Sequence, residues 1–187
     1  PPLDEPTSQE LVNACLGGQA QPPWLHSVYG FTHGVPGWLC LIAELAKTGA
    51  LAELPASADE IAGIYLESCM AALHWPQPEQ GLKLLRWLAL WGRLRVDSNF
   101  VEQDEFRFLK KQGISEIDAR GLLGQLTKTG LVRNWGIEQR LFSVEPLIIR
   151  EHILATWLLR KEGDHYAVKD EGTALVKLMV DRGVPSE

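Results

Sequence analysis

The sequence predicts a mainly α-helical chain in two small units, with one β-hairpin in the second unit. Three observations support this prediction. Segments with apolar residues at helical spacing, bounded by proline and glycine, fill most of the chain. Two β-prone runs flank a turn around Gly136. The stretch HWPQPEQ, residues 74–80, holds two prolines in three residues and is the best boundary between the units.

The first half, residues 1–76, is predicted to be a small helical bundle. Thr7 followed by Glu10 is typical of a capping box, in which each side chain bonds a backbone N–H at the helix start. Proline suits the first helical turn, where its missing N–H would have no partner in the helix. The helices are expected to start at Thr7, Pro22–Pro23, Pro36 and Ser57, and the first and third to end at Gly17–Gly18 and Gly49.

The second half, residues 77–165, shows the element order of a winged helix-turn-helix domain. An apolar helix over 82–94 and a short helix near 104–113 come first, followed by a helix over 115–130. Ser115 is the expected N-cap of that third helix, and Ile117 and Leu122 belong to its apolar set. A hairpin over 131–144 and a helix over 146–161 complete the pattern. Residues 166–187 are expected to form one more helix, a candidate start of a further unit.

Composition sets limits on the function. The chain has 187 residues, 45% of them hydrophobic and 22% charged, with a formal net charge of −6, so nucleic-acid binding would require a local basic patch. No apolar run approaches the roughly 20 residues that span a bilayer, and we expect a cytoplasmic protein with no membrane partner. The three cysteines are expected to be buried free thiols. The missing start methionine suggests a piece of a larger protein.

The sequence lacks four motifs that are typical of common enzyme classes. The sequence has no G-x-x-x-x-G-K-[ST] phosphate loop, no G-x-G-x-x-G turn, no G-x-S-x-G elbow and no H-E-x-x-H pair. Its five histidines do not pair with cysteines or with one another at ligand spacing, so we expect no metal. We therefore expect no catalysis from this chain alone.

Basic residues on the third helix and the hairpin of the second half raise the question of DNA binding. They are Arg120, Lys128, Arg133 and Arg140. Glu116, Asp118 and Glu138 lie among them, so the local charge is only slightly positive. A dedicated DNA binder neutralises phosphates with more basic residues, and we expect DNA to be a less favoured partner than protein.

The stretch YGFTHGVPGWLCLIAEL, residues 29–45, resembles the glycine–x–proline motif of the STAND class of P-loop ATPases and their AAA+ relatives. In that class the motif opens a helix of the helical lid that follows the ATPase core, and a winged helix comes next. The resemblance extends over roughly residues 8–160 as an order of elements. It implies a regulatory lid and winged-helix segment that couples nucleotide state to conformational switching.

The resemblance also implies site residues and partners. Pro36 would approach the adenine or ribose of ATP or ADP, and Gly34 would allow close approach of the backbone. The nucleotide would be held mainly by an ATPase core outside this chain, so the full-length protein would be an ATPase. The partners would be that core and downstream sensor or effector segments. Some members have a phosphate-sensing histidine where this sequence has Pro146, and the resemblance does not extend to that sensor.

Three alternatives remain open at this stage. Gly34 and Pro36 are also what a simple helix start requires. A winged-helix transcription regulator would bind duplex DNA through the basic residues named above. A protein-interaction adaptor would dock a partner on a tryptophan-rich surface, and it requires Trp24 or Trp135 to be exposed.

Overall fold

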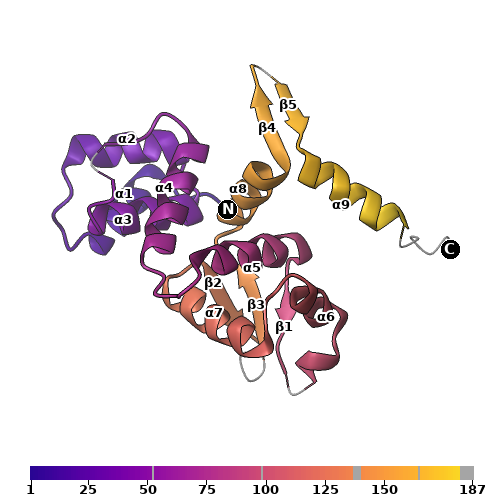
Figure 1. Ribbon diagram of the computed structural model, residues 1–187. Helices are drawn as coiled ribbons and strands as arrows, with labels where there is room; N and C mark the ends of the chain where they lie inside the picture. The colour runs from indigo at the N-terminus through magenta and orange to yellow at the C-terminus, as the bar shows by residue number, and fades with distance from the viewer. Residues whose placement is uncertain (52, 98, 137–139, 164, 182–187) are drawn as a thin grey trace. The chain divides into compact units, whose positions relative to one another are not determined.

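A computed structural model describes residues 1–51, 53–97, 99–136, 140–163 and 165–181. The chain forms two compact units, Pro1–Ser68 and Cys69–Glu187. Both are mainly helical, and the second also contains small antiparallel sheets (Figure 1). The prediction of a mainly α-helical protein is confirmed.

The first unit is built from α1 (Glu5–Cys15), α2 (Pro22–Thr32), α3 (Pro36–Lys47) and most of α4 (Ala58–Ala71). Proline opens α2 and α3, as predicted. The N-cap of α1 is Asp4 instead of Thr7: the Thr7 N–H donates to the Asp4 side chain at 2.9 Å. The most deeply buried side chains of its core, each at most 1% exposed, include Val12, Val28, Leu39, Ile42 and Ile61.

Helices α1 and α3 pack against each other, and the contacts at their two ends indicate that they run in the same direction. Before α1, the Leu3 N–H donates to the Gly34 carbonyl at 2.7 Å, just ahead of α3. Beyond the other end of α1, Leu16 lines a hollow together with Ala46 and Lys47 from the last turn of α3. The two starts therefore lie together, and so do the two ends.

The second unit begins with α5 (Pro78–Trp91), β1 (Leu94–Arg95), the 3-10 turn η1 (Phe100–Glu102), α6 (Asp104–Lys111) and α7 (Glu116–Lys128). Strands β2 (Val132–Trp135) and β3 (Leu141–Val144) follow and pair antiparallel, with Val132 opposite Val144. Strand β1 pairs with the other edge of β3, giving the order β1-β3-β2. Leu94, predicted to extend the α5 helix, lies in β1 instead.

Buried leucines join the helices of this unit. Leu84 and Leu88 of α5 and Leu122 of α7 are fully buried. Ser115 caps α7 as predicted: its hydroxyl accepts from the Asp118 N–H at 3.1 Å, and the Asp118 carboxylate accepts from the Ser115 N–H at 3.4 Å. Ile117, predicted to belong to the apolar set of this helix, is 83% exposed. The buried side of α7 is formed by its leucines and Ala119.

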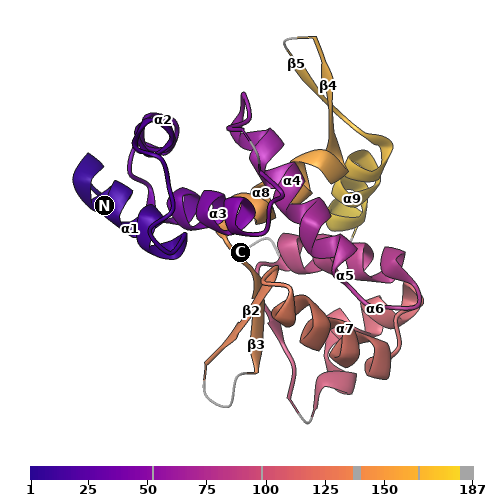
Figure 2. The same cartoon turned by 90° about the vertical axis from the view of Figure 1, so that its left-hand side faces the viewer.

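Helix α8 (Leu147–Leu158) packs on α5, where the Arg150 guanidinium donates to the Ala89 carbonyl at 2.7 Å. The predicted helix over 146–161 is too long. After Leu158 the chain enters strand β4 (Leu159–Glu162), which pairs with β5 (His165–Val168) in a second hairpin. Both views show this hairpin extending away from α8 (Figures 1 and 2). Helix α9 (Asp170–Asp181) follows, within the predicted C-terminal helix.

The cysteines differ from the prediction of three buried thiols. None of the three forms a disulfide, but Cys15 and Cys40 are exposed, and Cys69 alone of the three is buried. Cys15 and Cys40 lie on helices whose other side faces the core of the first unit. An apolar neighbourhood in the sequence therefore does not establish which side of a helix a thiol occupies.

Candidate functional site

The turn before α3 contains the first pair of candidate residues, Gly34 and Pro36. His33 (φ 48°) and Gly34 (φ 72°) both adopt the left-handed conformation that reverses the chain after α2. Gly34 is buried, and a Cβ there would lie 2.9 Å from the Leu3 carbonyl carbon and closer still to the carbonyl oxygen. The backbone approach that Gly34 allows is thus made by residue 3 of this chain.

Pro36 has a different environment. It is exposed at the start of α3, next to Val35, which is 40% exposed. The N–H groups of Trp38 and Leu39 both donate to the Val35 carbonyl at 3.1 Å. The exposed side chains of Val35 and Pro36 give this helix start an apolar surface, which suits contact with a flat ring.

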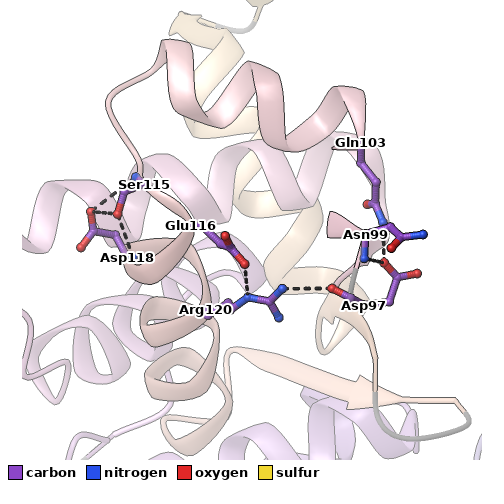
Figure 3. A network of polar contacts seen from close by, with 7 residues as sticks. All are labelled: Asp97, Asn99, Gln103, Ser115, Glu116, Asp118 and Arg120. Atoms are coloured by element: carbon purple, nitrogen blue, oxygen red, sulfur yellow. Dashed lines mark hydrogen bonds and ion pairs between the residues drawn. The ribbon is translucent and has the colours of Figure 1, made fainter. Parts of the chain in front are cut away.

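Arg120, the first of the basic candidates, is held within the second unit (Figure 3). Its Nε donates to Glu116 at 2.8 Å, and a terminal nitrogen donates to the Asp97 carbonyl at 3.0 Å. The guanidinium also lies 5.4 Å from the centre of the Phe100 ring. These contacts connect α7 to the segment after β1 and hold Arg120 in one place.

The Asp97 end of this network is itself fixed. Asp97 Oδ1 accepts from the Asn99 N–H at 2.9 Å and from Gln103 at 3.3 Å, and Oδ2 pairs with Arg95 at 2.8 Å. This arrangement could not be predicted from the sequence, because Arg120 and Asp97 are 23 residues apart. The contacts of Arg120 therefore indicate a structural role, which is to hold α7 against the segment after β1.

Lys128 and Arg133 are exposed, in the last turn of α7 and on β2. Arg140 is exposed next to β3, and its carbonyl accepts from the Val96 N–H at 2.8 Å. The structure thus places exposed basic residues at the end of α7 and on the adjoining hairpin. The first turn of α7 holds the carboxylates of Glu116 and Asp118. Glu138, the third acidic residue considered above, lies outside the described residues.

Trp135 lies in a polar setting that the sequence did not indicate. The Arg93 guanidinium stacks 4.4 Å from the ring centre, and the indole N–H donates to the Ser143 hydroxyl at 3.2 Å. The Ser143 hydroxyl in turn donates to Glu145 at 3.3 Å. Trp135 is 36% exposed, as the adaptor alternative requires, whereas Trp24 is half-buried.

A shallow hollow of about 410 Å³ lies in the first unit, where α1 and α3 end. Trp24 and Lys47 line it together with Leu16, Leu51 and nearby side chains. Residues 1–68 contain eight Asp and Glu side chains against Lys47 as the one Lys or Arg, a net charge of −7. The hollow therefore holds the one Lys or Arg side chain of an acidic unit.

Comparison with protein-family models finds no match, and comparisons with curated proteins and with solved structures find no significantly similar protein. Among the described residues, no three His, Cys, Asp or Glu side chains are grouped so as to hold a metal ion. The described helices include none that is both long and apolar enough to cross a bilayer.

Proposed function

We propose that residues 77–165 form a winged helix-turn-helix domain and that residues 1–76 form a helical lid. The order helix, strand, two helices and two further strands supports the first part, with α7 in the place of the recognition helix. Strand β2 of the hairpin packs against α7. The lid assignment rests on the four helices before this domain and on the turn at the head of α3.

We further propose that this pair of units is the regulatory segment of a STAND-type or related AAA+ ATPase. It would couple the nucleotide state of an ATPase core to the position of downstream sensor or effector segments. A bound ligand can shift such a two-state arrangement only by the difference in its affinity for the two states. The single observation that carries the proposal is the order of elements, a helical unit with the glycine–x–proline turn followed by the winged-helix order.

In this proposal Pro36 is the residue of the chain that meets ATP or ADP. It is exposed, it lies on an apolar helix start, and it could pack against the adenine or ribose. Gly34 would act indirectly, since it sets the turn that presents Pro36. Phosphates and Mg²⁺ would be bound by the core, because such chemistry needs a phosphate loop and acidic magnesium ligands. The chain alone would not hydrolyse ATP.

The first test is the mass of the native polypeptide, by immunoblot of the source material with an antibody to this chain. The proposal requires a product several times larger than 20.8 kDa. A native product near that mass leaves no room for an ATPase core and would refute the proposal.

The second test is nucleotide binding by full-length Pro36→Ala. We expect weaker binding of ATP and ADP with unchanged folding, because the substitution removes ring contact at an exposed position. Pro22→Ala is the matched control, since Pro22 is also an exposed proline at a helix start. If the two variants bind ATP and ADP with equal affinity, Pro36 does not contact the nucleotide and serves only to start the helix.

A second candidate function, a DNA-binding regulator, is favoured by exposed Lys128 and Arg133. It predicts duplex binding that weakens steeply with salt, and a smaller salt slope in Lys128→Ala and Arg133→Ala. Titration of a labelled duplex at low and moderate salt measures both. No binding at low salt, or an unchanged slope in both variants, would exclude this candidate.

A further inference from the structure

The outer face of α7 has an unusual composition for a helix exposed to water. Residues 117, 120, 124 and 128 follow helical spacing and form one exposed stripe. Ile117 at its beginning is 83% exposed, the highest value among the exposed large apolar side chains of the described residues. Lys128 is at its other end. The stripe is therefore apolar at one end and basic at the other.

Gly121 and Gly124 lie near the middle of this helix, and among the described residues only Gly121 packs closely against a side chain of another segment. A Cβ on Gly121 would lie 2.6 Å from the Trp75 ring, so packing of Trp75 requires that glycine. A Cβ on Gly124 would meet nothing within 4 Å, although Gly124 is exposed in a helix and glycine disfavours helices more than any residue except proline. Packing within the described chain does not account for Gly124.

The charges along α7 are complementary to those of a second α7 that runs antiparallel to it. Glu116 and Asp118 flank Ile117 at the first turn, and Lys128 lies eleven residues after Ile117, about 16 Å along the axis. The midpoint of the stripe falls between residues 122 and 123, next to Gly124. A second α7 placed antiparallel would set each acidic first turn against the other copy's Lys128, and Gly124 would let the two backbones come close.

We propose that two copies of this protein associate through the outer faces of their α7 helices, antiparallel across a two-fold axis. The interface is isologous, so each contact occurs twice. Arg120 lies within the stripe and is already held by Glu116 and the Asp97 carbonyl, so it does not need to be ordered on association. The face is small, and the dimer is expected to be weak and sensitive to salt.

The test is sedimentation equilibrium of the full chain over a wide concentration range, at low and high salt. Two variants disrupt the pairing from opposite ends. Lys128→Glu places carboxylates opposite the acidic first turn, and Ile117→Lys places ammonium groups opposite Lys128. Each alone is expected to weaken association about tenfold or more, because each repulsion occurs twice. Mixed in equal amounts, they should associate, because each new charge then faces its opposite.

Two further variants separate this proposal from general effects. Lys111→Glu changes the same charge at an exposed position on α6 and should leave association unchanged. Gly124→Gln should abolish association without lowering the thermal midpoint, because the site is open and glutamine favours helix. A chain that stays monomeric at high concentration, a failure of the mixture to associate, or equal weakening by Lys111→Glu would each overturn the proposal.

Discussion

Replacing Gly34 with alanine should destabilise the first unit far more than its one added methyl group suggests. Residue 34 has φ 72°, and a left-handed conformation costs a residue with a Cβ about 1–2 kcal/mol. The Cβ would also lie 2.9 Å from the carbonyl carbon and 3.0 Å from the nitrogen of Leu3. Leu3 must then move, which breaks its 2.7 Å hydrogen bond to Gly34 at a further cost of about 1 kcal/mol.

Gly49→Ala is the matched control for this substitution. Gly49 has φ 74°, nearly the same conformation, but a Cβ there would meet nothing within 4 Å. We expect a loss of about 2–3 kcal/mol for Gly34→Ala and about 1–2 kcal/mol for Gly49→Ala, the difference of about 1 kcal/mol arising from Leu3. Native-state hydrogen exchange of the α1 and α3 amides measures the free energy of opening in this unit alone. Equal losses in the two variants would refute the predicted clash with Leu3.

Two further predictions concern titratable groups of the first unit. Hydrogen bonds from the Thr7 hydroxyl and N–H lower the pKa of Asp4, so the stabilising effect of its carboxylate is present above the ordinary aspartate range and is lost as the pH falls through the lowered pKa. Asp4→Ala should therefore lower the thermal midpoint of the unit at pH 7 and leave it nearly unchanged in strong acid. An equal decrease at both pH values would contradict this prediction. Partial burial, and then the nearby Cys15 thiolate, raise the pKa of Cys40. Mass spectrometry after brief iodoacetamide treatment at about pH 9, where cysteine thiolates form, should therefore find Cys40 modified more slowly than in Cys15→Ser. Cys69 should be modified only after unfolding. An unchanged Cys40 rate in Cys15→Ser would contradict the assigned charge effect.

Helix starts that depend on local chemistry could be predicted from the sequence. Pro22 and Pro36 open α2 and α3 because the fixed φ of proline and its missing N–H suit the first turn. The predicted start of α1 is wrong because Asp4 and Thr7, two residues able to cap a helix, lie within four residues of each other. Asp4 accepts the Thr7 N–H, so Thr7 lies inside the helix instead of before it.

Features that depend on distant partners could not be predicted. The sequence predicts helix where β4 lies, because Leu158 and Leu159 continue the apolar helical pattern, but pairing with β5 decides the conformation. Periodicity predicts that Ile117 belongs to the apolar set, because it does not distinguish a core residue from a single exposed one. For the candidate site, the basic residues could be named, but the bond from Arg120 to the Asp97 carbonyl depends on the tertiary fold.

The shared direction of α1 and α3 also has an electrical consequence. Peptide dipoles align along a helix and leave a partial negative charge at its C-terminal end. Two parallel neighbours add these fields instead of cancelling them, and both negative ends lie at the hollow lined by Leu16, Ala46 and Lys47. Lys47, in the last turn of α3, thus places the one Lys or Arg side chain of residues 1–68 where the summed field most favours a cation.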